Sequence, residues 1–325
     1  MTIRESASKS PPSSSSTARG RIEAPIQVVL VLAGLCVGSF LNVVVARVPE
    51  GRSIVRPRSA CPRCRSPIPW KDNLPLLSYL LLRGRCRACR ERISLRYPLV
   101  EALTAGLFVL AAAAGEPSVP LLLARLVFLS TLVAIAFIDL DHLIVPDEIS
   151  IPLFLVGPAV CAFVPELQAG SWLADKVGSA AGGAFLASVL GAALGAGLLA
   201  LVRAAGTRAF RRSAERQGGE AMGFGDVKLA AGLGAWTGAQ GVGLAFFLAA
   251  ALGAFVGVGN VARIALAVGS RRRARASRTR HGAIAVARRF GAAIPFAPFL
   301  AAGSMAALLA RDTLLRWIWP LGFGG

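Results

Sequence analysis

The chain has 325 residues, 55% of them hydrophobic and 16% charged, a balance too apolar for a soluble domain and typical of a protein that crosses a membrane several times. Its 36 Lys and Arg residues against 17 Asp and Glu give a net charge of +19. In a soluble protein this excess would suggest nucleic-acid binding. No basic patch interleaved with aromatic residues is present, however, and cytoplasmic loops of membrane proteins collect Lys and Arg. We therefore expect a lipid bilayer as partner and no nucleic acid.

The N-terminal residues 1–24 are rich in Ser and Pro and contain no apolar run, which predicts a disordered tail. The first apolar run extends over 20 residues, from Ile26 to Val45, and has no convincing signal-peptidase site after it. A run of this length can cross a bilayer. Residues 25–46 are therefore predicted to form the first transmembrane helix.

Further apolar runs predict the rest of an all-α polytopic membrane protein of about eight transmembrane helices. Two of these runs, 99–115 and 227–243, are short for a bilayer core of about 30 Å. The runs that follow the first one cover about 99–115, 118–138, 149–165, 177–202, 227–243, 244–268 and 292–314.

Charge in the connecting segments predicts their orientation. Arginines are concentrated in 47–98, in the loop after the fifth run (203–216) and in the loop before the last run (271–289), whereas the short loops near Glu116 and Glu166 carry few basic residues. Because basic loops face the cytoplasm, we expect these three segments inside and both termini outside. Four basic residues in the N-terminal tail disagree, but the much larger charge of 47–98 should dominate.

Four cysteines in the first basic segment form two CxxC pairs, Cys61 with Cys64 and Cys86 with Cys89. Each CxxC pair directs two sulfurs to one point, and two pairs complete the four-thiolate cage that zinc prefers. Two disulfides are the alternative, but a reducing cytoplasm disfavours them. We therefore expect a small cytoplasmic zinc-binding domain at 47–98, between the first and second transmembrane helices. Its zinc is expected to be structural, since four thiolates leave no open position for water.

Acidic residues near membrane depth are costly and are candidate functional residues. One group, Asp139 and Asp141, ends the third apolar run, with Asp147 shortly after, and Asp226 opens the sixth run. The predicted topology places both groups at the cytoplasmic edge of the membrane. They can therefore meet in space, although Asp139 and Asp226 are 226 − 139 = 87 positions apart.

A pair of close carboxylates can share one proton, because both cannot ionise cheaply. The ionised carboxylate then takes a proton from water while the neutral one donates a proton to a peptide carbonyl, which is the chemistry of aspartyl proteases. Asp226 belongs to a GxGD pattern with Gly223 and Gly225, and Lys228 follows. The glycines would allow a sharp turn and close approach of an extended substrate, and a helix N-terminus would favour the Asp226 anion.

Less specific roles are open for each carboxylate. Asp147 precedes an apolar run and has Ser150 three positions on, so we interpret it as a helix N-cap. Asp141 lies on roughly the opposite helix face from Asp139, and one of these two is expected to face solvent or basic groups. Spacing alone does not decide between them. Asp226 could also be only an N-cap.

The ordered motifs of the chain resemble those of the type IV prepilin peptidases, a family of bifunctional leader peptidases and N-methyltransferases. The resemblance covers most of residues 35–305. It rests on the two CxxC pairs and on GSFLNVV at 38–44, RVP at 47–49, DNLP at 72–75, LRG at 82–84, ISLRYPLVE at 93–101, the stretch 138–147, GFGDVKL at 223–229 and IPFAPF at 294–299.

This resemblance implies that Asp139, seven positions before Pro146, and Asp226 are the catalytic pair, with Asp141 outside it. It implies a peptidase of the bacterial inner membrane, with its peptidase domain at 99–318, that removes the basic leader of a prepilin or pseudopilin. It also implies methylation of the new N-terminus from S-adenosylmethionine, in association with the cysteine-bearing loop. No glycine-rich methyltransferase fingerprint is visible, so the methyl donor's binding residues stay unassigned.

Two other functions compete with the peptidase. A zinc-ribbon membrane scaffold of a secretion machine, without catalysis, would have no reason to retain a pair of aspartates at one membrane edge. A transporter with carboxylates as proton relays would place them near the helix centres. The position of Asp139 and Asp226 at the ends of their apolar runs favours the peptidase.

Overall fold

The computed structural model describes residues 23–115, 117–209, 223–274 and 295–318. The expected N-terminal tail, apart from its last two residues, and most of the arginine-rich loop at 271–290 lie outside these ranges. Within them the chain is helical, and its only β-type pairings are two isolated bridges, Ala60 with Pro67 and Arg85 with Arg92. The all-α prediction is therefore confirmed.

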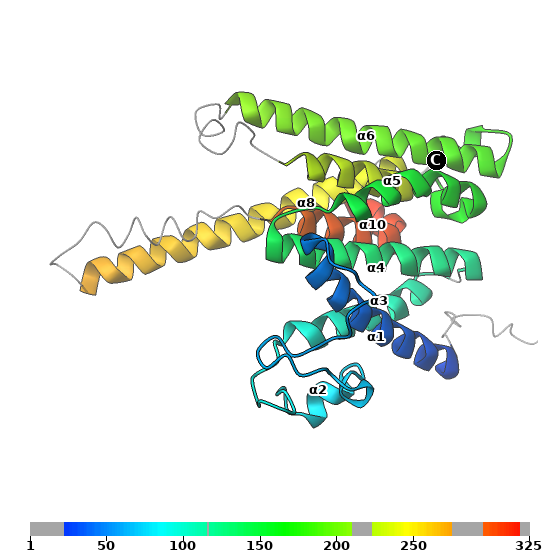
Figure 1. Cartoon of the computed structure of the whole chain (residues 1–325). Helices are drawn as coiled ribbons and strands as arrows, with labels where there is room; N and C mark the ends of the chain where they lie inside the picture. The colour runs from blue at the N-terminus through cyan, green and yellow to red at the C-terminus, as the bar shows by residue number, and fades with distance from the viewer. Residues whose placement is uncertain (1–22, 116, 210–222, 275–294, 319–325) are drawn as a thin grey trace, which may run out of the picture.

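The cysteine-bearing segment separates the first two long helices of the chain (Figure 1). In chain order the α-helices are α1 (Ala24–Arg47), α2 (Leu77–Leu81), α3 (Arg96–Ala113), α4 (Val119–His142), α5 (Asp147–Phe163), α6 (Ala180–Ala209), α8 (Phe224–Ala274) and α10 (Ala297–Ile318), and the short 3-10 turns are η1 (Val48–Glu50), η2 (Trp70–Asp72), η3 (Pro165–Gln168) and η4 (Ala174–Lys176).

Five helices in the described residues are long and apolar enough to cross a membrane: α1, α3, α4, α6 and the part of α8 up to Asn260. Helix α5 has 17 residues, and the apolar part of α10 ends at Arg311. Because α8 consists of two segments, the expected set of about eight apolar helices is present among the described residues.

Helix α8 reverses direction at Gly238, whose φ of 69° and ψ of −178° are not helical. A Cβ added at Gly195 of α6 would lie 3.0 Å from the carbonyl carbon of Ala230 and 3.2 Å from Cγ2 of Val242. A straight helix would hold residues 230 and 242 about 18 Å apart, so the two parts of α8 run back alongside each other. The predicted boundary between the two apolar runs, at 243–244, is wrong by several residues. The chain reverses at Gly238, where the buried side chain of Gln168 fills the space that a Cβ would need.

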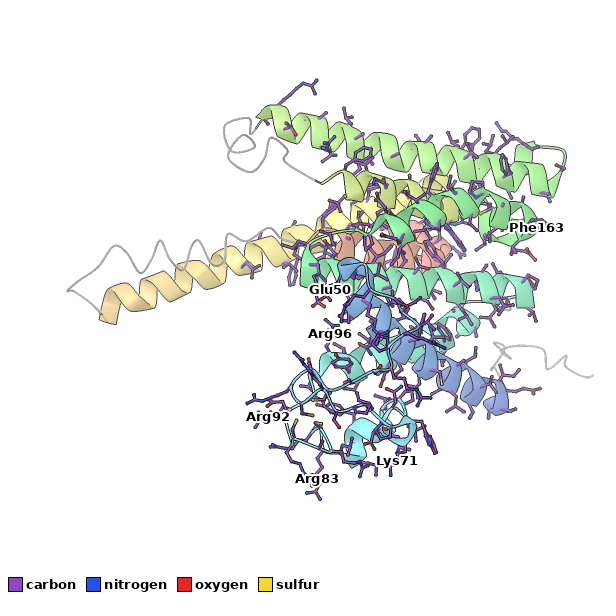
Figure 2. All side chains as sticks on the ribbon, in the orientation of Figure 1. Glu50, Lys71, Arg83, Arg92, Arg96 and Phe163 are labelled. Atoms are coloured by element: carbon purple, nitrogen blue, oxygen red, sulfur yellow. The ribbon has the colours of Figure 1, made fainter. Side chains whose placement is uncertain are left out.

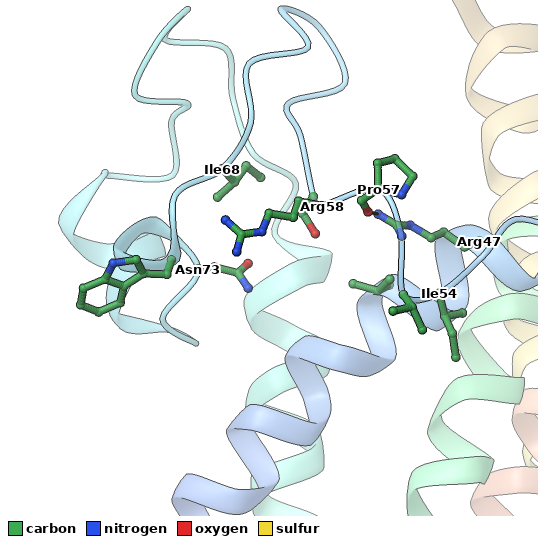
Figure 3. Close-up of a pocket in the computed structure, with 10 residues that line it drawn as sticks. Arg47, Ile54, Pro57, Arg58, Ile68 and Asn73 are labelled. Atoms are coloured by element: carbon green, nitrogen blue, oxygen red, sulfur yellow. Dashed lines mark hydrogen bonds between the residues drawn. The ribbon is translucent and has the colours of Figure 1, made fainter.

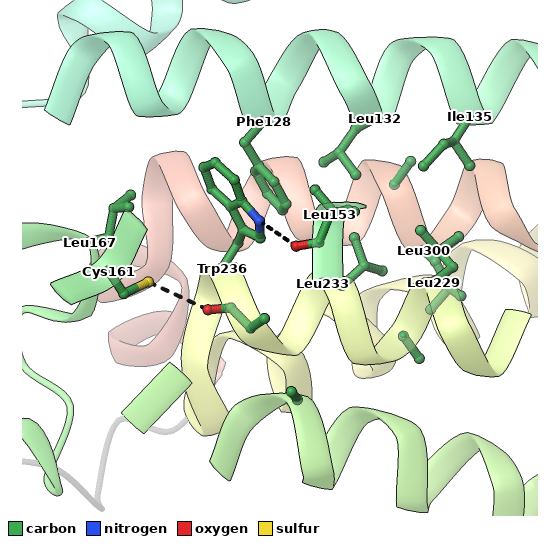
Figure 4. Packing of buried hydrophobic residues seen from close by; sticks show 14 of the residues in the cluster. Phe128, Leu132, Ile135, Leu153, Cys161, Leu167, Leu229, Leu233, Trp236 and Leu300 are labelled. Carbon is green, nitrogen blue, oxygen red and sulfur yellow. Dashed lines mark hydrogen bonds between the residues drawn. The ribbon is translucent and has the colours of Figure 1, made fainter. Parts of the chain in front are cut away.

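The main apolar core lies between α4, α5, α6, α8 and α10 and holds together the two helices that carry the candidate aspartates (Figure 4). At its centre the rings of Phe128 on α4 and Trp236 on α8 stack with centroids 5.1 Å apart and an interplanar angle of 13°. The indole N–H of Trp236 also donates to the carbonyl of Leu153 on α5, at 2.9 Å. Stacking and this hydrogen bond fix the rotation of α8 relative to α4 and α5.

Helices α1 and α3 form a closely packed pair at the side of this bundle. A Cβ on Gly34 or Gly38 of α1 would lie 2.5 or 2.6 Å from the Cα atom of Ala105 or Glu101 on α3, so only glycine permits this approach. The cysteine-bearing segment with α2 lies beside this pair and away from α6 and α8 (Figure 1). It is attached to α3 through Glu101, whose buried carboxylate accepts the backbone N–H of Leu76 at 2.8 Å.

Candidate active site and metal centre

One end of the helix bundle collects the segments that the sequence singled out. Helices α1, α4 and α6 end there, and α5 and α8 begin there (Figure 1). The arginine-rich segment 47–98 starts at this end, the segment 203–216 starts in the last turns of α6, and both candidate aspartates lie at this end. The charge-based topology requires these segments and the aspartates to lie on one side of the membrane, and their position at one end of the bundle agrees with this for either orientation.

Asp139 lies in the last turn of α4 and is buried, with 5% of its surface exposed. Its Oδ2 accepts the backbone N–H of Ala297, the first residue of α10, at 3.0 Å. The first N–H groups of a helix have no partner within the helix and carry its positive dipole end. Helix α10 therefore positions and stabilises the Asp139 carboxylate. Sequence reasoning missed this contact, although the two prolines that flank Ala297 could have indicated a helix start.

Asp226 lies in the first turn of α8 and is half-buried. The negative charge of the Asp139 carboxylate acts on Asp226 through space, so the two carboxylates lie near each other. The fold thus brings together two carboxylates that are far apart in sequence, each at the end of a helix of the same core. The catalytic roles of Asp139 and Asp226 remain predictions.

Gly225 next to Asp226 packs against the connection between α4 and α5. A Cβ there would lie 3.2 Å from Cβ of Val145. Neither Gly223 nor Gly225 is among the glycines with positive φ in the described residues. Gly225 lies in the first turn of α8, so the structural requirement there is close packing, and a sharp turn at Gly223 stays a prediction.

The two other carboxylates of this region are occupied by basic partners. Asp141 is exposed and pairs with Arg96 at the start of α3. Asp147 is the first residue of α5, and its Oδ1 lies 2.5 Å from Nζ of Lys228. The interpretation of Asp147 as an N-cap is wrong: Pro146 is the N-cap residue, and no side chain caps this helix. The sequence singled out Lys228 but gave it no partner.

The four cysteines of the two CxxC pairs gather at one point, with all four Sγ atoms within 4.8 Å of one another. The two knuckles share one backbone pattern. In each, the N–H of the residue four positions after the first cysteine donates to that cysteine's carbonyl, at 2.9 Å from Arg65 and 3.0 Å from Arg90. Both arginines have positive φ, 56° and 60°. Two copies of the same tight turn therefore present the sulfurs to one another.

The spacing of the sulfurs fits a tetrahedral metal. Zinc–sulfur bonds of about 2.3 Å separate the sulfurs of such a site by about 3.8 Å. The Sγ atoms of Cys61 and Cys89 are 3.8 Å apart and those of Cys64 and Cys86 are 4.0 Å apart, and none of these cysteines forms a disulfide. The backbone N–H groups of Cys64 and Arg63 lower the pKa of the Cys61 thiol to about 7. The donor set therefore suits a thiolate-bound divalent cation such as zinc.

Ion pairs order the polypeptide around the knuckles. Arg87 binds both carboxylate oxygens of Asp72, at 2.6 and 2.7 Å, and this bidentate contact lowers the pKa of Asp72 below its usual value. Arg63 pairs with Glu91 across the two knuckles at 2.9 Å. Figure 2 shows Arg83 and Arg92 on the side of the segment that faces away from the helices. These two arginines thus point away from the helices.

Two family models match successive parts of the chain. The model described as the bacterial peptidase A24 N-terminal domain matches residues 32–114, and the model described as the type IV leader peptidase family matches residues 126–258. The first match contains the cysteine-bearing segment, and the second contains both candidate aspartates.

Curated proteins named prepilin leader peptidase/N-methyltransferase are similar over most of this chain. The protein from Aeromonas hydrophila is 36% identical over 313 residues, 89% of this chain and 92% of its own length. The one from Bacillus subtilis is 32% identical over 296 residues, 91% of this chain and 99% of its own length. A protein of the same name from Myxococcus xanthus is 55% identical over 133 residues, 41% of this chain and 39% of its own length. No solved structure matches the chain.

Proposed function

This chain belongs to the type IV leader peptidase family, and on that basis we propose that it cleaves prepilin-type leader peptides with Asp139 and Asp226 and then methylates the trimmed N-terminus. It is a multi-pass bacterial membrane protein that acts in type IV prepilin processing. We propose the chemistry of cleavage, the residues that carry it out and the side of the membrane on which it takes place.

The observation that carries the proposal is the meeting of Asp139 and Asp226 within reach of each other's charge at one end of the bundle. A carboxylate pair in this position shares one proton. The ionised member takes a proton from a water molecule as the water oxygen bonds to the scissile carbonyl carbon, and the neutral member donates its proton to the carbonyl oxygen. When the resulting diol collapses, the C–N bond breaks and the amine takes up a proton.

The surroundings support this assignment of roles. Ala297 donates a backbone N–H to Asp139, so one carboxylate is held in a fixed orientation. Asp141 and Asp147 are held in ion pairs with Arg96 and Lys228, which leaves them poor candidates for proton transfer. We assign Gly225 to packing against Val145 and Lys228 to fixing the start of α8. Gly223 leaves the approach to Asp226 open.

The cysteine cluster is assigned a structural role. Cys61, Cys64, Cys86 and Cys89 would hold a zinc ion, which would offset half of the negative charge of four thiolates and would join the two knuckles. Because the four sulfurs complete the coordination, no position is left for a reacting water. The cysteine-bearing segment is instead the part of the chain that we associate with methylation, with S-adenosylmethionine as the methyl donor.

The substrate is a prepilin or pseudopilin whose basic leader is cut at the cytoplasmic edge of the inner membrane. Incubation of membranes that contain the chain with a candidate prepilin, followed by mass measurement of the substrate's N-terminus, tests both activities. Loss of the leader together with a gain of one methyl group is the expected result. An unchanged substrate mass with every prepilin of the host would contradict the peptidase assignment and favour the non-catalytic scaffold.

A further inference from the structure

Large apolar side chains are exposed together on the cysteine-bearing segment, within the stretch 70–81 that contains η2 and α2. Trp70 is 79% exposed and Leu81 is 72% exposed. A contiguous apolar surface of this kind marks an interaction site for a membrane or a protein. Neither the aspartate pair nor the metal cage uses these side chains. The apolar patch consists of Trp70, Leu74, Leu77, Leu80 and Leu81.

Ser78 gives this stretch an inner and an outer side. Its buried hydroxyl accepts the backbone N–H of Leu74 at 2.9 Å and donates to the carbonyl oxygen of Lys71 at 3.0 Å, which joins η2 to α2. The three exposed leucines of α2 are spaced three and four positions apart, so they share one face of the helix. The apolar patch is therefore a fixed outer face and not a set of scattered side chains.

Two sets of contacts fix the position of the cysteine-bearing segment relative to the helices. At the end of α1, the guanidinium of Arg47 donates to the carbonyl oxygens of Ser53 and Pro57, at 2.9 and 2.8 Å (Figure 3). On α3, the buried carboxylate of Glu101 accepts the N–H of Leu76, the residue immediately before α2. The start of α2 therefore lies directly beside α3.

The contact with Glu101 places the start of α2 at membrane depth. Helix α3 has 18 residues, a length of about 27 Å that barely crosses a hydrocarbon core of about 30 Å. Its first residue, Arg96, pairs with Asp141 in the last turn of α4, so α3 enters the membrane from the aspartate end. Glu101 is 101 − 96 = 5 positions further on, about 7.5 Å along the helix. A backbone N–H at this depth needs a partner, and Glu101 supplies one to Leu76.

We propose that the apolar patch is inserted between the lipid headgroups and acyl chains of the bilayer, so that residues 70–81 anchor the cysteine-bearing segment to the membrane surface. Elements that lie in this boundary bury their apolar face by about 5–10 Å, which matches the depth set by Glu101. An indole such as that of Trp70 is favoured there because it is apolar with one polar N–H. Lys71 is exposed next to it and can meet lipid phosphates. The arginines that face away from the helices, Arg83 and Arg92, stay in water (Figure 2).

The test is fluorine NMR of the full-length chain labelled with fluorotryptophan, in nanodiscs of phosphatidylcholine and phosphatidylglycerol. Trp70→Phe and Trp236→Phe identify the two signals that matter. A lipid with a nitroxide at the top of its acyl chain should remove more of the Trp70 signal than a water-soluble gadolinium chelate does. Trp236, which is buried in the helix core, is the internal control and should lose less signal than Trp70 to the nitroxide lipid.

A charged variant of the patch should reverse this pattern. Leu80→Glu combined with Leu81→Glu places two carboxylates on the outer face of α2 and should keep it out of the lipid, so that the chelate removes more of the Trp70 signal. Arg92→Glu changes the net charge by the same two units on the side that faces away, and it should behave as wild type. Zinc content and the midpoint of thermal unfolding, measured on each variant, show whether the segment is still folded.

Three results would overturn the inference. A wild-type Trp70 signal that the chelate removes as fully as the nitroxide lipid would show that the patch faces water. Protection from both reagents would show that a protein surface, such as a second copy of this chain, covers the patch. Lipid contact that persists unchanged in the folded double variant would show that the leucines of α2 do not anchor the segment.

Discussion

Lys228 and Asp147 join the starts of two helices, with Nζ and Oδ1 2.5 Å apart, two positions after the proposed catalytic residue Asp226. A second pair, Arg96 with Asp141, has the same relation to Asp139, since it also lies two positions away. Each aspartate helix is thus connected to a neighbouring helix, α5 or α3, beside its proposed catalytic residue. Both pairs are part of the framework of the site.

The Lys228–Asp147 pair leads to a charge-reversal prediction. Its side chains are 28% and 54% exposed, so the pair should contribute no more than about 1 kcal/mol. Asp147→Lys should lower the rate of leader cleavage severalfold, since it places two cations together at the start of α8. Asp147→Lys combined with Lys228→Asp should restore most of that loss. A double variant that is worse than both single variants would show that the pair does not act by mutual attraction.

Gly225 gives a packing prediction. A Cβ at this position would lie 3.2 Å from Cβ of Val145, so Gly225→Ala should shift the α4–α5 connection or α8 and reduce cleavage. Val145→Gly, combined with Gly225→Ala, should recover part of the activity, because it removes the Cβ atom that the added Cβ would meet. Gly223→Ala is the control, because the nearest atom to its added Cβ is 4.0 Å away. Cleavage assays on the Gly225 variant, the double variant and Gly223→Ala would contradict the packing argument if Gly223→Ala were the more damaging change.

The cysteine cluster predicts about one zinc per chain. Metal analysis of the purified protein at pH 8 and at pH 5.5 should show loss of zinc at the lower pH. Because the pKa of Cys61 is lowered to about 7, this thiol is ionised above that pH and takes up a proton below it, in competition with the metal. Cys86→Ser should reduce zinc content and methylation while cleavage continues, since the metal has no place in the proteolytic step. Intact disulfides in a metal-free protein would contradict the assignment.

Orientation in the membrane is tested by reporter fusions. Fusions after residues 60, 212 and 280 should report the cytoplasm, and fusions near residues 117 and 168 should report the other side. The helix ends agree with this grouping. Residue 60 follows α1, residue 212 follows α6 and residue 280 precedes α10, and these helices end or begin at the end of the bundle that contains Asp139. A fusion after residue 60 that reports the outside would reverse the orientation and separate the cysteine segment from cytoplasmic S-adenosylmethionine.

Much of the fold could be read from the chain because apolar length is a strong signal in a membrane protein. The eight apolar runs correspond to the helical segments found, including the short runs at 99–115 and 227–243. The reversal within α8 was placed too late, since its position depends on Gln168, which packs against Gly238 from a distant part of the sequence. Hydropathy alone cannot detect such a contact.

The residue types of the site could be predicted from the sequence, but the contacts that hold these residues in place could not. Two aspartates at the ends of apolar runs indicate a shared site, and the CxxC spacing indicates a metal cage. The partner of Asp139 is a backbone N–H at Ala297, 297 − 139 = 158 positions away, which no side-chain pattern encodes. The partner of Asp147 could not be predicted from the sequence either. Its place before an apolar run suggested a cap, whereas Lys228 from α8 supplies the nearer positive charge.

The central claim is that Asp139 and Asp226 act as one unit. The most direct test is the rate of prepilin cleavage in membranes that contain equal amounts of Asp139→Asn, Asp226→Asn, the double variant and Asp141→Asn. The account predicts a loss of at least about a hundredfold in each of the first two, no further loss in the double variant, and substantial activity in Asp141→Asn. Full activity in Asp226→Asn, or loss in Asp141→Asn with activity retained in Asp139→Asn, would contradict it.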